Sequence, residues 1–483
     1  MRSGETKHMW KIIDKKKGPV YRQIMDQVME NIEKGQLNPG DRLPSERKLA
    51  QVFQSNRTTV VRALDELRDL GVIISQRGSG RYINQTQWGR YVVPRVNWRE
   101  LFSQRYEQID DEYERQMNAK KKQSDFLDLF SSEMSKELLP NVLFPAYSMK
   151  DIIEKEQQMT CFGYLPLIRK IKNYLMEKFL FDFSKTELLI TSGGQQAIFL
   201  ILQTILSNGD TIAVETPSFF YRLSLFRASG IRLYGVPMDK EGIDLNKLEV
   251  SIRKNKLKAV LVNPNFQNPT GKVMSQKRRK DLVTLCRKYQ LPIIEDDVFS
   301  DLSFHTVERQ KLSSIHSIDP ENVLYIGSLS RVLGQTTKIG WIVGLRSFVT
   351  RLAKAQEVME FSMSIFTQMV ATTVFEESYD TKISTVREEL YKKSLLLTEW
   401  AKEQQFFEVC PINGGYYAWI TWNGKKLTRE IAEEMIRLGI GIAPSFLFGE
   451  ETNGLRVNFS RMNESQLPFF KTKMANLAQQ LRE

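Results

Sequence analysis

Three stretches near the start of the chain carry apolar residues at the three- to four-residue spacing of an amphipathic helix. The first runs from Val20 to Leu37 with Ile24, Val28 and Ile32 on one face. The second is LPSERKLAQVF, in which Ser45 is a candidate N-cap, and the third is RTTVVRALDELRDLG. The pattern predicts three helices, and the last two follow one another as closely as in a helix-turn-helix.

The period of the pattern changes after these helices. VIISQRGSGRYI consists of two short β-rich runs on either side of the turn from Gly78 to Gly80. Such a sequence predicts a β-hairpin. Three helices followed by a hairpin predict a winged helix-turn-helix domain, which we place at residues 10–85.

The connection that follows has only a weak apolar period. No glycine or proline occurs between Pro94 and Pro140, and the middle, SQRYEQIDDEYERQMNAKKKQ, is densely charged. This composition indicates a partly helical or mobile linker, which we place at residues 86–125.

From residue 126 onward, β-rich apolar runs alternate with helical stretches. The runs include ELLITSG, DTIAVETP, KAVLVNPN, LPIIEDD and ENVLYIGSLS. This alternation predicts an α/β domain over residues 126–483, with a parallel sheet covered by helices on both sides. The protein is therefore expected to be multidomain, with an α+β head and an α/β body.

Composition supports a folded chain of more than one domain. A length of 483 residues exceeds one ordinary domain, and 41% hydrophobic with 26% charged residues is typical of globular proteins. No run approaches the ~20 apolar residues of a membrane span, and the N-terminus lacks a secretory signal pattern, so a cytoplasmic protein without membrane contact is expected. Cys161, Cys286 and Cys410 are widely spaced, which argues against disulfides and a zinc site.

Positive charge is concentrated at the start of the chain. The net charge is +12, and residues 1–90 hold 17 lysines and arginines against 10 acidic residues. A basic segment suits binding to nucleic-acid phosphates. Charge alone also fits a solvated surface, and on that criterion the second interpretation is favoured.

The motifs of the head carry a family resemblance. VYRQIMDQVMENIEKGQLNPGDRLPSERKLA, NRTTVVRALDELRDLGVI and QRGSG resemble the GntR family of winged helix-turn-helix regulators over about residues 18–84. The resemblance implies binding to double-stranded DNA through Arg47, Asn56, Arg57, Thr58, Thr59, Arg62, Gln76, Arg77 and Gly78. Arginine forks and threonine hydroxyls suit base edges and phosphates.

The body carries a second resemblance. ITSGGQQAI places a glycine turn between a strand and a helix, where free amides suit a phosphate, although one such turn is more often structural. VETPSFF, VNPNFQNPTG, IIEDD, YIGSLSR, TKIGW and NGLRVNFS follow in order. This series resembles the fold-type I aminotransferases that use pyridoxal phosphate (PLP), which have a small C-terminal α+β subdomain. A GntR head on such a body marks the MocR subgroup of regulators.

The resemblance implies a role for individual residues. Phe219 would stack on the cofactor ring, Asn268 would bond its phenolic oxygen and Asp296 its ring nitrogen. Arg456 would bind a ligand carboxylate. The remaining cofactor-binding positions are Gly193, Gly194, Gln195, Ser328, Ser330 and Lys338.

One departure from the family alters the expected chemistry. In the family, the segment that corresponds to GSLSR ends in the lysine that forms the Schiff base with PLP. In this chain the same position is Arg331. Arginine stays protonated and cannot serve as this nucleophile, so no catalytic residue is assigned. The family tyrosine after EDD is also missing, because Val298 and Phe299 stand there. Lys338 is a less favoured substitute nucleophile, because its motif position is at the phosphate end.

Three functions remain open at this point. The favoured one is a transcription regulator whose body senses a small amino or phosphorylated effector without catalysis, with PLP held only non-covalently or absent. The alternative is a PLP-dependent aminotransferase with an attached DNA-binding domain. The third is a purely structural dimerisation body. By resemblance a homodimer is expected, with DNA sites arranged as paired half-sites.

Overall fold

The computed structural model describes the chain at residues 10, 13, 18–34, 36–76, 79–84, 111–123, 125–305, 312–360, 363–375, 379–449 and 453–482. The chain divides into two compact units, residues 1–104 and 105–483, and each is considered by itself. Within the described residues, no helix is long and apolar enough to cross a membrane. The same residues contain no cluster of side chains suited to a metal ion.

The first unit has the three helices and the hairpin that the sequence predicts. Its elements are α2 (Val20–Glu33), α3 (Glu46–Val52), α4 (Arg57–Asp69), β1 (Ile73–Gln76) and β2 (Gly80–Ile83). Ser45 caps α3 by accepting from the Lys48 amide, as its position suggested. The apolar faces meet in one core that includes Ile24, Val28 and Leu64. The helix-turn-helix and its wing are therefore confirmed.

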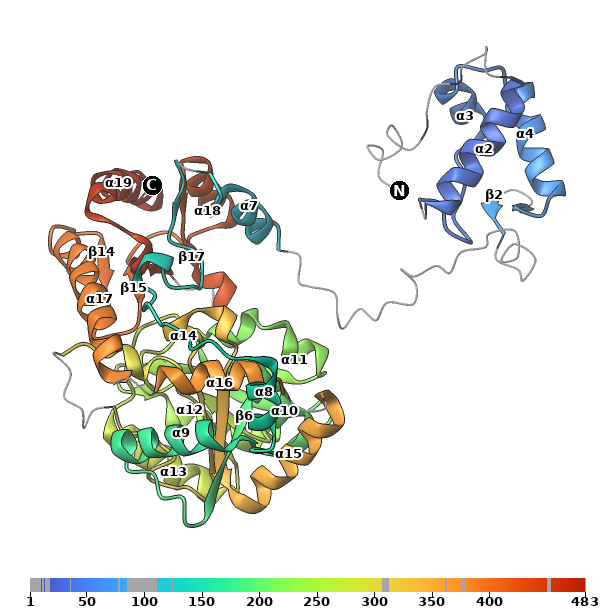
Figure 1. Ribbon diagram of the computed structural model, residues 1–483. Helices are drawn as coiled ribbons and strands as arrows, with labels where there is room; N and C mark the ends of the chain where they lie inside the picture. The colour runs from blue at the N-terminus through green and yellow to red at the C-terminus, as the bar shows by residue number, and fades with distance from the viewer. Residues whose placement is uncertain are drawn as a thin grey trace. The chain divides into compact units, whose positions relative to one another are not determined.

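The second unit is built on an eight-stranded sheet (Figure 1). Its strand order is β6-β13-β12-β11-β10-β7-β8-β9. The strands are β6 (Thr186–Thr191), β7 (Thr211–Thr216), β8 (Arg232–Asp239), β9 (Gly242–Ile243), β10 (Val260–Val262), β11 (Ile293–Asp296), β12 (Val323–Ser328) and β13 (Gly340–Leu345). Strands β8, β7, β10, β11 and β12 run parallel.

The predicted parallel sheet contains two antiparallel strands, because β9 lies antiparallel to β8 at one edge and β13 is antiparallel inside the sheet. β13 lies antiparallel to both of its neighbours, β12 and β6. Only residues 329–339 separate β12 from β13, and a parallel return needs a crossover of a dozen or more residues, usually with a full helix. The chain therefore turns back beside β12, and the sheet is mixed.

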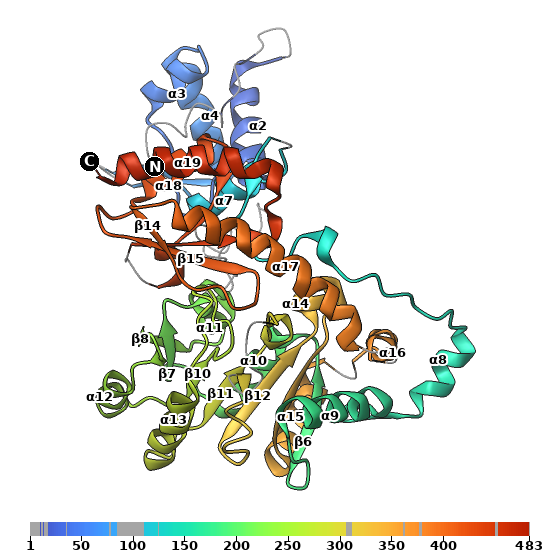
Figure 2. The same ribbon diagram turned by 90° about the vertical axis from the view of Figure 1, so that its left-hand side faces the viewer.

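Helices cover both faces of this sheet, as predicted (Figure 2). Consecutive residues of β11 show the two faces, because Ile293 packs with one helix layer and Ile294 with the other. The first layer includes α12 (Leu245–Asn255) and α13 (Gln276–Lys288). The second includes α10 (Gly194–Ile205), α11 (Ser224–Ala228) and α15 (Arg346–Glu360).

The second unit contains further helices. They are α8 (Met149–Glu156), α9 (Leu165–Phe179), α14 (Ser330–Leu333), α16 (Ile365–Val374) and α17 (Tyr379–Lys402). The long helix α17 leads into the small C-terminal subdomain that the sequence predicts.

The sheet of this subdomain has the strand order β14-β15-β18-β17. The elements are β14 (Phe407–Val409), β15 (Tyr417–Trp422), α18 (Arg429–Arg437), β17 (Ala443–Pro444), β18 (Gly454–Asn458) and α19 (Leu467–Arg482).

Part of the segment assigned to the linker is packed. Residues Glu112–Lys120 form helix α7, which lies against α18. Tyr113 and Met117 on this helix are fully buried, and the Tyr113 hydroxyl donates to the carbonyl of Ile442 at 2.6 Å. The sequence predicted a partly helical linker but not the packing of this helix, because only two of its residues are buried. The larger unit thus begins upstream of residue 126.

Candidate functional site

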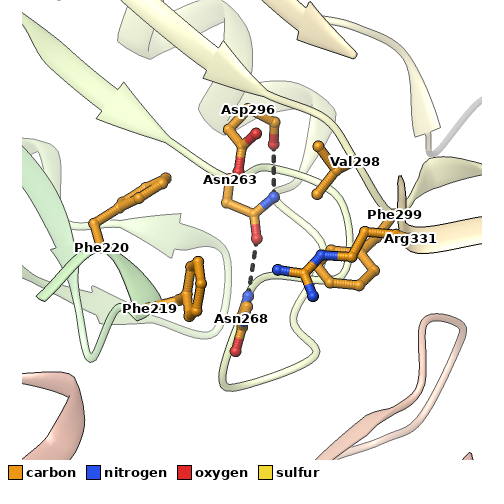
Figure 3. Close-up of a pocket in the computed structure, with 8 residues that line it drawn as sticks. All are labelled: Phe219, Phe220, Asn263, Asn268, Asp296, Val298, Phe299 and Arg331. Atoms are coloured by element: carbon orange, nitrogen blue, oxygen red, sulfur yellow. Dashed lines mark hydrogen bonds between the residues drawn. The ribbon is translucent and has the colours of Figure 1, made fainter. Parts of the chain in front are cut away.

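A small cavity lies at the carboxyl ends of the parallel strands (Figure 3). Ligands of open α/β sheets bind at this edge. The loops after β7, β10, β11 and β12 supply its walls. The lining residues are Phe219, Phe220, Asn263, Asn268, Asp296, Val298, Phe299 and Arg331.

Asn263, which sequence reasoning missed, joins two of these loops. Its side chain accepts from the Asn268 amide at 2.9 Å and donates to the Asp296 carbonyl at 2.6 Å, as Figure 3 shows. The loop after β10 is thereby tied to the end of β11. The Asn268 side chain keeps an unpartnered Nδ2 atom although the residue is only 3% exposed. A buried donor of this kind calls for an acceptor from a ligand or water.

The glycine turn before α10 lies close to the other predicted phosphate-end residues. Gly193 has a φ of 86°. A Cβ atom placed on it would lie 3.7 Å from the Ser330 hydroxyl oxygen and 3.9 Å from Cα of Lys338. Gly340 permits this approach, because a Cβ there would lie 2.6 Å from the Gly193 carbonyl carbon. No side chain caps α10, so its first turn can receive an anion.

The remaining members of that set differ in exposure. Gln195 and Lys338 are exposed, and Ser328 is buried with its hydroxyl donating to the Ile339 carbonyl. Gly194 packs beside Ser328 and Val298, between the turn and the cavity wall. The structure therefore brings Gly193, Ser330 and Lys338 together but leaves the Gln195 side chain outside the cavity lining.

Asp296 presents a buried carboxyl group to the cavity. Burial raises its pKa to about 7, which Arg331 opposes and Asp297 reinforces. No described residue donates a hydrogen bond to this carboxyl. Phe219 forms a half-buried aromatic wall, held by its own amide, which donates to the Asn268 carbonyl at 3.0 Å. Together they offer one ring face and one weakly acidic group.

Arg331 lies at the opposite side of the cavity from Phe220 (Figure 3). Its Nη1 donates to the Ser132 carbonyl at 2.8 Å and to the Tyr416 hydroxyl at 3.4 Å. The guanidinium carbon lies 5.5 Å from the Phe219 ring centre and 5.4 Å from that of Phe299, within cation–π range. Burial works against the charge, yet the nearby phenols and Asp296 keep the pKa of Arg331 above its usual value.

Tyr416 and Tyr417 were not identified from the sequence. Both hydroxyls donate to the Ser132 carbonyl, at 3.3 and 2.6 Å, and both rings lie against Phe299. The departure at Val298 and Phe299 thus removes a phenol from one loop, while β15 and the residue before it bring two phenols near Arg331. The only signal was the YY pair itself, which has no motif spacing.

Arg456 is fully buried behind Asn268 and is not among the residues that line the cavity. Its Nη1 donates to the Asn268 side chain at 3.1 Å and its Nη2 to the Phe130 carbonyl at 2.7 Å. The guanidinium lies 4.2 Å from the Tyr417 ring centre. Burial lowers the pKa of Arg456 to about 10. Only its Nε atom has no partner.

The packed linker helix reaches the turn that carries Phe219. Phe219–Arg222 form the 3₁₀ turn η3, and Arg222 bonds to Glu114 of α7 at 2.8 Å. Asp111, at the N-cap of α7, pairs with Arg429 of α18 at the same distance. The helix that follows the linker is therefore attached both to the small subdomain and to a wall of the cavity.

In the first unit, the predicted DNA contacts gather around the start of α4. Asn56 caps this helix by accepting from the Thr59 amide at 2.8 Å. Arg57 is 61% exposed and donates through two nitrogens to Glu46, at 2.9 and 3.1 Å. Exposed pairs of this kind are weak, so DNA can replace Glu46 as the partner. Glu46 also holds Arg81 and was missed by sequence reasoning.

The other predicted contacts are distributed around this helix. Arg47 and Thr58 are exposed, and Gln76 is exposed at the end of β1. Arg62 is exposed on α4 with its guanidinium 4.1 Å from the Tyr21 ring centre. Arg77 and Gly78 lie outside the described residues. Their role in the wing stays a prediction.

Two family models match the chain, one for each unit. Residues 125–470 match "Aminotransferase class I and II", and residues 20–83 match "Bacterial regulatory proteins, gntR family". The chain therefore belongs to the aminotransferase class I and II family and carries a GntR-type DNA-binding domain in front. It is a transcription regulator with an aminotransferase-like domain.

Individual relatives agree with this assignment. The chain is 34% identical over 421 residues to the uncharacterized HTH-type transcriptional regulator YdfD of Bacillus subtilis, covering 84% of this chain and 85% of YdfD. It is 25% identical to the HTH-type transcriptional regulator NorG of Staphylococcus aureus, over 87% and 95% of the two chains. The crystal structure of the multiple substrate aminotransferase from Thermococcus profundus matches in fold, with a TM-score of 0.71, 24% identity, and coverage of 80% and 99%.

The raised pKa of Asp296 predicts a pH-dependent effect of removing its charge. The pKa of Asp296 is about 7 in the folded chain, and its ordinary value is 3.8. Between these pH values the folded protein keeps a proton on this carboxyl that the unfolded chain has lost. The carboxyl thus becomes increasingly destabilising as pH rises from about 4 to 7. We expect Asp296→Asn to stabilise the protein, and the gain should be larger at pH 8 than at pH 5 by on the order of 2 kcal/mol.

Urea denaturation of both proteins at the two pH values measures this difference. Asp281→Asn, at an exposed position of α13, is the matched control for the change in net charge and should show no such pH trend. A gain of Asp296→Asn that is equal at pH 5 and pH 8 would contradict the raised pKa.

Proposed function

We propose that the protein is a DNA-binding transcription regulator whose aminotransferase-like domain binds a small ring ligand and does not catalyse amino-group transfer. The observation that carries the proposal is Arg331 in the lining of the cavity. By the motif resemblance, its position is that of the family's Schiff-base lysine. Ligand binding can regulate DNA binding only if the ligand has a higher affinity for one conformation of the protein than for another. DNA binding then changes the affinity for the ligand by the same factor.

The residues at the cavity fit PLP in a non-covalent form. Phe219 provides a ring wall, Asn268 an unpartnered donor and Asp296 a carboxyl for a ring nitrogen. Gly193, Ser330 and Lys338 meet at the uncapped start of α10 and would hold the phosphate. When bound, PLP supplies an electron-withdrawing ring to amino-acid chemistry. An effector that uses the same features without being PLP is equally compatible with them.

Arg331 argues against turnover on two physical grounds. Its guanidinium remains protonated and delocalised, so it can neither attack a carbonyl carbon nor remove a proton. Its side chain is also bonded to Ser132 and Tyr416 in the resting protein. The competing function, a working aminotransferase with a DNA-binding head, is supported by the retained Asp296 and Asn268 and by the family. It needs another nucleophile.

We further propose that the regulator is a homodimer. The larger unit exposes several large apolar side chains before and along α8 and on the neighbouring α16, such as Leu143 at 83% and Met149 at 71% exposure. Ile153 of α8 and Phe366 of α16 are exposed as well. Large exposed apolar side chains that gather on one face mark interaction sites. A second copy of the chain would cover it and present two DNA-binding heads to paired half-sites.

The DNA-binding assignment predicts the effect of a change at Arg57. We expect Arg57→Ala to weaken binding to an operator, selected from random DNA with the wild-type protein, by roughly ten-fold or more, because one arginine contact to DNA contributes about 1–3 kcal/mol. Gel-shift titration measures the loss. Arg68→Ala, in the last turn of the same helix, is the control and should change affinity by less than about two-fold.

Unchanged affinity of Arg57→Ala would count against α4 as the recognition helix. Footprinting of the wild-type protein on the same operator tests the dimer. Protection of two half-sites is expected. Protection of one half-site by a protein that sediments as a monomer would exclude the homodimer.

The proposal that Arg331 replaces the Schiff-base lysine predicts the outcome of chemical trapping. After incubation with PLP and reduction with borohydride, we expect wild-type protein to show only the scattered labelling of surface lysines. Arg331→Lys should gain a stoichiometric adduct at position 331, because it restores an amine at the cavity. Peptide mass spectrometry locates the adduct.

A stoichiometric adduct on wild-type protein at Lys338 would overturn the non-covalent proposal and favour the aminotransferase alternative. Failure of Arg331→Lys to form the adduct, with its unfolding temperature unchanged, would contradict the assignment of position 331 to the site.

A further inference from the structure

Arg331 turns an unoccupied edge of its guanidinium toward the cavity. Its two hydrogen bonds both use Nη1, and neither Nε nor Nη2 bonds to any described residue. The residue lines the cavity, so this edge is available to a ligand. Two neighbouring N–H groups of a guanidinium match the two oxygens of a carboxylate.

Arg456, in contrast, offers almost nothing to the cavity. It is fully buried, does not line the cavity, and its two terminal nitrogens are bonded to Asn268 and Phe130. The resemblance implied that this residue binds the ligand carboxylate. Within the described site, Arg331 instead presents two free donors, Nε and Nη2, to the cavity.

A second, independent group calls for an oxygen acceptor on the ligand. Asn268 lines the cavity, is 3% exposed, and its Nδ2 has no partner. Like the Arg331 edge, it requires an oxygen acceptor. Phe219 and Phe299 add two apolar rings to the cavity lining. The centre of each ring lies within 5.5 Å of the Arg331 guanidinium carbon. Aromatic walls of this kind suit a planar ring.

We propose that the ligand of this cavity is a planar ring acid whose carboxylate pairs with Arg331, and that a protonated amine in the same position is disfavoured. The inference rests on the proposed function, since it assumes that a small ring ligand binds here, and it adds the chemical class. An ammonium group would face the permanent charge of Arg331, which is repulsive. Asp296 opposes an anion little, because burial raises its pKa to about 7 and leaves it largely protonated below that pH.

Two probes that share a ring and a phosphate test the proposal. Pyridoxamine 5′-phosphate carries an aminomethyl group where 4-pyridoxic acid 5′-phosphate carries a carboxylate. Calorimetric titration of the full-length protein at pH 6.5 should show at least about ten-fold tighter binding of the acid, the difference that one charge-assisted pair contributes. Arg331→Gln should lose this preference.

Arg437→Gln is the matched control, because it removes an exposed arginine of α18 that pairs with Glu434. It should keep the preference for the acid. The unfolding temperature of each variant identifies one that has simply lost its fold. If Arg331→Gln is unfolded, Arg331→Met tests the loss of the preference for the acid in its place. Competition between the two probes on wild-type protein measures the preference itself.

The outcomes separate this inference from the proposed function. Equal affinities, tighter binding of the amine, or a preference that survives in Arg331→Gln would overturn the inference alone. Failure of both probes to bind at millimolar concentration would count against the PLP-like ligand of the proposed function as well. A drop in unfolding temperature without a change in preference would mean that Arg331 is structural.

Discussion

The guanidinium of Arg331 contacts four segments that are far apart in the sequence. It bonds to the carbonyl of Ser132 and the hydroxyl of Tyr416, and it lies against the rings of Phe219 and Phe299. A cation removed from water must keep such partners. The charge therefore fixes the segment before α8, the start of β15 and the walls of the cavity around one point. It also lowers the pKa that burial imposes on Asp296.

The fold separates the residues that line the cavity from the packed sheet that supports them. The cavity residues stand on loops at the carboxyl ends of β7, β10, β11 and β12, and the sheet beneath them is packed by helices on both faces. Function in α/β folds is set by these loops. The turn η3 carries one cavity wall and is tied by Arg222 to Glu114 of α7. The helix that emerges from the linker thus shares a contact network with the site.

Much of this arrangement could be predicted from the sequence, and the exceptions have physical reasons. Continuous apolar runs identified the buried strands, and helical spacing identified α2, α3 and α4. The antiparallel β13 was missed, because direction depends on the length of a connection and not on apolar period. The linker was predicted to be partly helical, but the packing of α7 was not foreseen, because only Tyr113 and Met117 are buried on it. Asn263, Tyr416 and Glu46 were missed because their roles depend on partners distant in the chain.

The central claim is that a permanent cation in place of an amine makes this domain a binding module. The most direct measurement is a half-reaction assay, in which purified protein with PLP is given a panel of amino acids and keto-acid formation is followed by mass spectrometry. The account predicts no formation above the rate of free PLP. Keto acid produced at a rate proportional to the concentration of the wild-type protein would contradict it.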